Sequence, residues 1–192
     1  MTKKHDDFWR NEATSEDYAD TNIPLKAQVD YLVEALKPAV FMDKVPLVTE
    51  FGCGYGRLTR EIQRAFPKAL VTGIDINSDI IEKAKARDKD SVYGVANTLK
   101  GRPEQSAVYC VQVLQHMPND RKRQFFQEAA SVLRRAGVLV FQYVEGASNT
   151  FLTHDAEFKD VSEWLTDAGF EVASVEHNLI QDRWTWVTAV KG

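Results

Sequence analysis

Short apolar runs alternate with amphipathic stretches along most of the chain. Five runs rich in β-branched and apolar residues lie between turn signals, as buried strands do. They are residues 47–51, 69–75, 92–95, 107–113 and 138–144. Two further runs, 170–175 and 184–190, follow each other with no helix between them. The last two therefore predict an antiparallel pair at the end of the sheet.

Helices are predicted by apolar spacing and by end signals. Apolar residues from Leu25 to Leu36 recur at helical spacing, with Pro24 at the start and Pro38 as the expected stop. A second stripe, from Leu58 to Phe66, ends at a proline. Further helices are expected at about 77–87, capped by Asn77 or Ser78, at 119–135, capped by Asn119 or Asp120, and at about 155–168.

This order of elements predicts an α/β fold. Parallel strands joined by crossover helices form a mostly parallel, Rossmann-like sheet with helices on both faces. The 192 residues fit one domain, with 1–38 as an N-terminal helical lid or appendage and 45–192 as the core. A composition of 44% hydrophobic and 27% charged residues supports a core that needs no disulfide or metal.

Charge and hydropathy narrow the possible partners. A net charge of −4 disfavours nucleic acid, whose binding needs a basic surface. The basic residues 121–123 and 134–135 are expected to form a solvated helix face. No apolar run approaches the roughly 18 residues of a membrane span, and no apolar signal core follows the first methionine. A cytoplasmic protein with reduced Cys53 and Cys110 and no membrane contact is therefore expected.

A glycine-rich loop follows the first predicted strand. It reads Glu50-Phe51-Gly52-Cys53-Gly54-Tyr55-Gly56-Arg57. Glycines let the backbone turn tightly beside a ligand, at a helix N-terminus that presents free N–H groups. A dinucleotide loop would read G-x-G-x-x-G, but here Arg57 stands where its third glycine belongs. Glu50 would repel a pyrophosphate and attract the amino group and sulfonium of S-adenosylmethionine (SAM), so the loop favours SAM over NAD.

Asp75 ends the second predicted strand. It lies about 20 residues beyond the loop, where an acidic side chain accepts hydrogen bonds from a ribose. The alternative role is to cap the helix that begins near Asn77. The complete strand, loop, helix and strand context favours ribose binding.

These motifs together resemble the core of class I SAM-dependent methyltransferases, in particular small domains of type 11 and type 25. The segments that carry the resemblance are Val48 to Gly56, Gly73 to Asn77, Val111 to Met117 and Val132 to Val140. The resemblance implies a seven-stranded sheet in the order 3-2-1-4-5-7-6, with the last strand antiparallel. It also implies that SAM is the cofactor and that S-adenosylhomocysteine (SAH) is the product.

The resemblance further implies a set of cofactor-binding residues. The methionine end would lie against Glu50, Gly52, Gly54 and Gly56, with Gln112 close to it, the ribose against Asp75 and the adenine against Ile76. The further cofactor-binding residues are Cys53, Arg57, Ala96 and Asn97. Asn97 departs from the family, which often has an aspartate near this position. It is expected either to replace that acceptor or to leave adenine to backbone and packing contacts.

Candidates for handling the methyl acceptor come from loops after the strands. His116 follows the fourth strand and is the first candidate for substrate contact or general base, with a role as a loop cap equally open. His154, next to Asp155, is the second candidate. Trp9 and Tyr18 are expected either to cover the cofactor or to pack in the core. Gln112 and Gln115 replace the glutamates of metal-dependent RNA methyltransferases, so no catalytic metal is expected.

Three functions remain open at this point. The first is a methyltransferase for an oxygen, nitrogen or sulfur of a small molecule or an accessible protein side chain. The fourth strand lacks the N-P-P-Y or D-P-P-Y motif of base-modifying enzymes. The second is a SAM- or SAH-binding regulator without activity, and the third is an NAD-dependent oxidoreductase.

Overall fold

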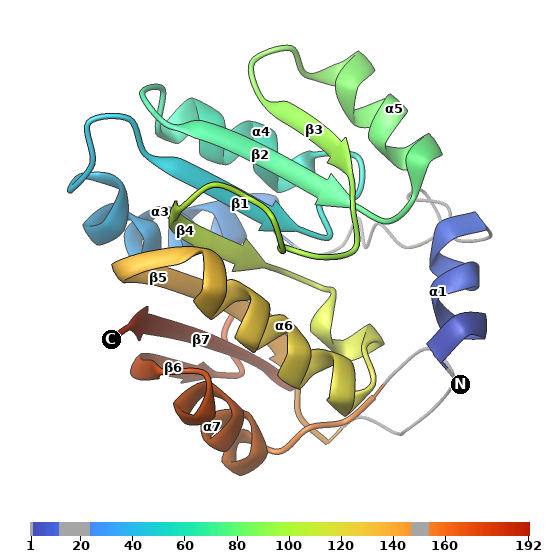
Figure 1. Cartoon of the computed structure of the whole chain (residues 1–192), viewed down its shortest axis with the longest axis vertical. Helices are drawn as coiled ribbons and strands as arrows, with labels where there is room; N and C mark the ends of the chain where they lie inside the picture. Colours follow the sequence, from blue (N-terminus) through green and yellow to red (C-terminus); the bar gives the residue numbers. More distant parts are fainter. Residues whose placement is uncertain (1, 12–23, 147–153) are drawn as a thin grey trace.

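The computed structural model describes residues 2–11, 24–146 and 154–192. Its seven strands form one sheet in the order β3-β2-β1-β4-β5-β7-β6, which confirms the predicted order (Figure 1). The strands β1 to β5 pair in parallel, and β7 is antiparallel to both β5 and β6. The strands are β1 (Leu47–Phe51), β2 (Leu70–Asp75), β3 (Val92–Val95), β4 (Gln105–Cys110), β5 (Leu133–Val144), β6 (Phe170–His177) and β7 (Trp184–Lys191).

Helices cover both faces of the sheet. One apolar cluster joins α3 and α4 to the sheet, and a second joins α6 and α7 to the opposite face. The helix α1 lies beyond the carboxyl ends of the central strands (Figure 1). The described helices are α1 (Thr2–Asn11), α3 (Leu25–Val40), α4 (Arg57–Ala65), α5 (Ser78–Arg87), α6 (Asn119–Val132) and α7 (Phe158–Asp167), with a 3-10 turn at Leu114–His116. Among them, none is long and apolar enough to cross a membrane.

The inner strand β5 shows why the sheet needs helices on both sides. Val138 and Val140 contribute to the cluster under α3 and α4, while Leu139 and Phe141 contribute to the cluster under α6 and α7. Side chains alternate between the faces of a strand, so an unbroken apolar run is buried on both sides. The carboxyl edge of this sheet is left for loops, and it carries the candidate site.

Three predicted boundaries were wrong. The helix α3 continues past Pro38 to Val40, because a proline near a helix end removes a single backbone bond. The helix α6 ends at Val132 instead of Arg135, and Leu133 pairs with Gln105 as the first residue of β5. The strand β4 stops at Cys110 instead of residue 113.

The predicted solvated face of 121–123 was wrong for one residue. Lys122 is 1% exposed, although it lies between two arginines. Its ammonium group donates to Asn119 Oδ1 at 2.9 Å, to His154 O at 2.6 Å and to Asp155 O at 3.3 Å. A buried lysine needs such acceptors because it leaves water as a charged group.

Candidate active site

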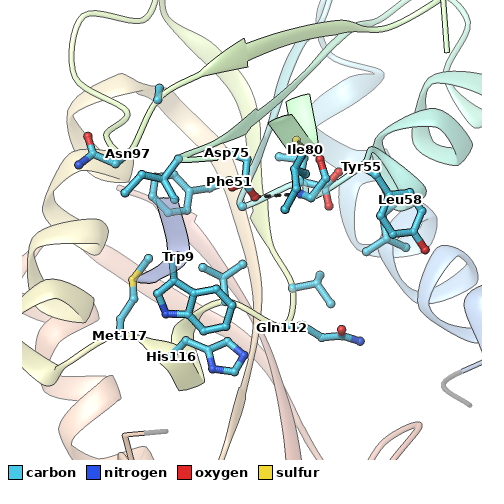
Figure 2. A pocket seen from close by; sticks show the side chains of 18 of the residues that line it. Trp9, Phe51, Tyr55, Leu58, Asp75, Ile80, Asn97, Gln112, His116 and Met117 are labelled. Carbon is cyan, nitrogen blue, oxygen red and sulfur yellow. Dashed lines mark hydrogen bonds between the residues drawn. The ribbon is translucent and has the colours of Figure 1, made fainter. Parts of the chain in front are cut away.

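A pocket lies at the carboxyl edge of the sheet, between the ends of β1, β2 and β4 and the helix α1. Its volume is about 220 Å³, and its wall contains the glycine loop, Asp75, Ile76 and the loop after β4 (Figure 2). Open α/β sheets bind ligands at this edge, where the strand order reverses. The strand order reverses here between the neighbouring strands β1 and β4, and the glycine loop follows β1 at this point.

The three glycines of the loop have left-handed backbones for different reasons. A Cβ on Gly52 would lie 2.2 Å from Val113 Cγ2, and a Cβ on Gly56 would lie 2.4 Å from Tyr93 Oη. Gly54 has φ of +53° and lines the pocket, and a Cβ there would meet open space out to 4 Å. Gly52 and Gly56 thus allow close packing within the protein, and Gly54 leaves open space where a ligand would lie.

Cys53 stands between the first two of these glycines. Its side chain is 6% exposed, it lines the pocket, and Sγ donates to Gly54 O at 3.4 Å. Burial raises the pKa of this thiol well above its usual range, and the nearby carboxyl groups of Glu50 and Asp75 raise it further. Cys53 is therefore held as a thiol.

Asp75 links the glycine loop to the start of α5. Its Oδ2 accepts from Gly54 N and its Oδ1 accepts from Asn77 N, each at 3.0 Å. Burial raises its pKa, although these backbone N–H groups oppose the rise. The side chain of Asn77 itself caps α5 by accepting from Asp79 N and Ile80 N. Each carboxylate oxygen of Asp75 keeps a lone pair for another donor, such as a ribose hydroxyl.

Glu50 is a buried carboxyl group at the start of the loop. It is 2% exposed, and its Oε2 accepts hydrogen bonds from Thr59 Oγ1 and, at 3.1 Å, from Tyr109 Oη. Burial raises its pKa to about 7, against the opposing effect of these hydrogen bonds. A carboxyl group poised near neutrality ionises when a cation is placed beside it, so Glu50 fits an ammonium group.

The loop after β4 forms the opposite wall. Gln112 has φ of 61°, and its backbone N–H donates to Gln142 Oε1 at 3.0 Å. Its side-chain nitrogen is buried without a hydrogen-bond partner in the described part of the chain. The residue departs from the β ladder here, which is why β4 is shorter than predicted.

The helix α1 touches both sides of the pocket. The rings of Trp9 and His116 lie 4.6 Å apart, and Trp9 O accepts from Asn77 Nδ2 at 3.2 Å. Figure 2 shows Trp9 directly beside His116 and Met117, at the side of the pocket away from Leu58. Trp9 thus lines the pocket, whereas Tyr18, the other aromatic residue considered for this role, lies outside the described residues.

The structure brings most predicted site residues together. The pocket wall contains Glu50, Gly52, Cys53, Gly54, Arg57, Asp75, Ile76, Ala96, Asn97, Gln112 and His116. Gly56 and His154 are not part of this wall. His154 donates its backbone N–H to Gln115 O at 2.7 Å, so this segment braces the loop that carries His116. Tyr143 Oη donates to Glu145 Oε1 at 2.6 Å, also outside the wall.

Sequence reasoning missed two buried polar residues near the site, Gln28 and Lys122. Gln28 lies on α3 and accepts from Arg57 Nη2 through Oε1 at 3.1 Å. Both residues stand on the apolar stripe of their helix, Gln28 with Leu32 and Leu36 and Lys122 with Phe125 and Phe126. A polar residue on such a stripe is the signal that would have found them.

Comparison with known proteins agrees with this geometry. A methyltransferase-domain family model matches residues 48–137. Trans-aconitate 2-methyltransferase of Escherichia coli is 30% identical over 120 residues, which are 58% of this chain and 47% of that enzyme. The chain therefore spans about half the length of the curated relatives it matches.

Solved structures share the fold over most of the chain. Magnesium protoporphyrin IX methyltransferase from Synechocystis PCC 6803, with bound SAH, has a TM-score of 0.78 and 19% identity and covers 100% of both chains. The cyclase SpnF has a TM-score of 0.69 and 16% identity and covers 84% of this chain and 80% of its own. Residues 48–137 thus match a methyltransferase domain, and the chain shares its fold with solved methyltransferases such as the Synechocystis enzyme.

Proposed function

We propose that this chain binds SAM in the pocket at the carboxyl edge and transfers its methyl group to an oxygen, nitrogen or sulfur atom of a small molecule. The observation that carries the proposal is the set of groups along one wall. Glu50 fits a cation, Gly54 leaves open space and Asp75 retains acceptor capacity for a ribose. No single one of these groups selects SAM, but their order along the pocket matches its parts.

The cofactor brings a methyl group already activated on a sulfonium, so the protein's task is mainly alignment. Methyl transfer needs the acceptor atom in line with the carbon–sulfur bond at near-attack distance. The wall made by Trp9 and His116 suits this task, because it adjoins the pocket and presents one titratable ring. His116 is proposed to contact the acceptor, and to accept its proton where the acceptor is protonated.

The acceptor is proposed to be a small molecule, because the pocket is compact and partly covered by α1. The Escherichia coli relative is named for trans-aconitate, a small carboxylic acid, so such acids are the first acceptors to test. Small amines, phenols and thiols follow in the same screen. An accessible protein side chain is the remaining acceptor class.

Isothermal titration calorimetry with SAM, SAH and NAD tests the cofactor. We expect micromolar binding of SAM and SAH and none of NAD. Asp75→Ala should weaken SAH binding by about 10- to 100-fold, because hydrogen bonds to a charged group contribute about 1.5–3 kcal/mol. If the wild-type protein binds neither SAM nor SAH, the proposal is wrong.

A SAM-binding protein that does not transfer methyl groups is the second candidate. It is favoured by one observation, namely that a cyclase has the same fold, so the fold alone does not fix the reaction. The measurement is SAH formation from SAM across the acceptor panel. SAM binding together with SAH formation on any acceptor above the acceptor-free rate would exclude this candidate.

A further inference from the structure

A second cavity lies next to the pocket at the carboxyl edge, between the start of α4 and the end of α5. Its volume is about 230 Å³. The residues that line it are Tyr55, Gly56, Arg57, Arg60, Arg87 and Asp88. Tyr55 and Arg57 also line the pocket at the carboxyl edge, and the other four residues do not. The two cavities therefore share one wall and differ beyond it.

Three of the side chains that line the second cavity are guanidinium groups. Arg57 and Arg60 belong to the first turn of α4, and Arg87 is the last residue of α5. Arg87 lies over the Tyr55 ring, with its Cζ 4.8 Å from the ring centre. A guanidinium does not lose its proton in proteins, so all three groups are cations at any ordinary pH. Cations gathered around one cavity repel one another, and an anion placed among them is attracted.

Asp88 brings a carboxylate to this cavity, but both of its oxygens already accept hydrogen bonds. Its Oδ2 accepts from Tyr93 Oη at 2.8 Å, and its Oδ1 accepts from Asp90 N at 3.0 Å. These contacts hold the carboxylate in the turn that follows α5. A single negative charge also does not balance three guanidinium groups, so the cavity keeps an excess of positive charge.

The arginines on α4 retain donors for a ligand. Glu61 Oε1 is shared between Arg60 Nε at 3.1 Å and Arg64 Nη1 at 2.9 Å. Within the described residues, Nε is the only side-chain nitrogen of Arg60 that donates a hydrogen bond. In the same ranges Arg57 donates through Nη2 alone, to Gln28 Oε1 at 3.1 Å. The remaining nitrogens match the oxygens of an anion in a paired geometry.

The start of α4 adds to the positive potential. Gly56 is the N-cap and has no side chain to accept from the helix, and the first turn of α4 contains no acidic residue. A helix N-terminus has a partial positive charge, so acidic residues stabilise it and basic residues do not. Placing Arg57 and Arg60 there costs helix stability. An anion held by the two residues explains this placement.

We propose that the second cavity binds a phosphate dianion, either inorganic phosphate or the phosphate group of a small monoester. Arg60 and Arg87 hold the phosphate oxygens from α4 and α5, and Arg57 contributes from the shared wall. Guanidinium groups bind phosphate oxygens in pairs, which gives this site its preference for phosphate over a spherical anion such as chloride. The inference does not depend on the proposed binding of SAM.

An NMR titration of the ¹⁵N-labelled protein with sodium phosphate tests the site. The backbone amides of Gly56, Arg60 and Asp88 should shift and saturate, with a Kd below about 1 mM. Sodium chloride at equal ionic strength is the control for screening, and should not reproduce these shifts. Phenyl phosphate distinguishes the two sources. Binding at least as tight as that of inorganic phosphate identifies a monoester site, and weaker binding identifies a site for the free ion.

Substitutions of single arginines separate the site from general charge. Arg60→Gln and Arg87→Gln should each weaken phosphate binding about tenfold or more, because each removes charge-assisted hydrogen bonds. Arg64→Gln is the matched control, since Arg64 lies on the same helix and pairs with the same Glu61 but does not line the cavity. Its phosphate affinity should change less than about twofold. Phosphate should raise the Tm of the wild-type protein and of Arg64→Gln more than that of Arg60→Gln.

Three results would overturn the inference. The first is equal weakening by Arg64→Gln and Arg60→Gln, and the second is the same amide shifts with chloride, because net charge alone would then explain the binding. The third is phosphate shifts centred on Gly54 and Asp75 that SAH reverses, which would place phosphate in the pocket at the carboxyl edge. Saturable phosphate binding by a protein that binds neither SAM nor SAH would refute the proposed function and leave this inference intact.

Discussion

Two loops turn the chain at the carboxyl edge of the sheet, and they solve the same steric problem differently. The loop after β1 uses glycine at each of its left-handed positions, 52, 54 and 56. The loop after β4 places a glutamine, Gln112, in the left-handed region. Both loops line the pocket, from opposite sides.

The difference reflects what each position must hold. At Gly56 a side chain has no room, because Tyr93 Oη lies only 2.4 Å from the position of a Cβ. At Gln112 the side chain has room, and its Nε2 has no hydrogen-bond partner among the described residues. A glutamine in the left-handed region is strained, and this strain is present in the folded protein. Left-handed glycine thus allows close packing at Gly52 and Gly56, whereas the left-handed Gln112 keeps a side chain that lines the pocket.

Substitution within the glycine loop should give the largest effect. Gly56→Ala combines a left-handed alanine with a contact against Tyr93, and should lower the free energy of unfolding by about 4 kcal/mol. Gly54→Ala, at an open position, should lower it by only about 1 kcal/mol and weaken SAH binding. Urea denaturation of both variants measures the difference. Equal destabilisation would remove the distinction between packing and pocket glycines.

Glu50→Gln, on the side of the pocket formed by the glycine loop, should change how the free energy of unfolding depends on pH. The pKa of Glu50 is raised in the folded protein to about 7 from 4.5, so wild-type stability falls as pH rises between these values. The variant lacks this fall. Relative to the wild-type protein it should gain about 3 kcal/mol between pH 4 and pH 8 without ligand, and bind SAH more weakly at both. A constant difference in urea denaturation would show that Glu50 titrates normally.

Lys122→Met tests how the segment at His154 and Asp155 is held against the loop after β4. Loss of three hydrogen bonds should lower the free energy of unfolding by about 2 kcal/mol at pH 7. Burial lowers the pKa of Lys122 to about 8, so the wild-type protein should gain stability relative to the variant as pH rises above 8. Hydrogen exchange should be faster at the backbone amide of His154. Unchanged exchange there would mean that Lys122 does not hold this segment.

Gln112→Gly should have the smallest effect on stability, and of the opposite sign. Removing a left-handed glutamine should raise the free energy of unfolding by less than about 1 kcal/mol. SAH binding should weaken about fivefold, through the lost amide donor. Destabilisation with unchanged SAH affinity would mean that Gln112 serves packing, as the glycines do.

Local patterns predicted the alternation of strands and helices and the motifs that line the pocket, whereas the strand order came from the resemblance to class I methyltransferases. The glycine loop, Asp75 and the cap at Asn77 are each recognisable within a few residues. Residues 133–135 were assigned to a helix because their intrinsic preference is helical. In the fold, Arg134 instead donates to Asp43 Oδ2 at 2.9 Å and to Ala39 O at 3.0 Å, contacts between residues about 90 positions apart.

The remaining site residues depend on such long-range contacts. Gln28 meets Arg57 across two helices, and His154 meets Lys122 and Gln115 across more than thirty positions. No local sequence pattern predicts which residues these side chains contact. The sequence shows only that a polar residue occupies an apolar stripe.

The protonation state of Cys53 affects whether this thiol can itself be methylated. SAM is an alkylating agent, and the nucleophile in any cysteine is the thiolate. Burial and two carboxyl groups keep the pKa of Cys53 well above its usual range, so the thiolate is scarce at neutral pH. With SAM bound as proposed, the protonated thiol would be a poor methyl acceptor, so the glycine loop would be protected from methylation by its own cofactor.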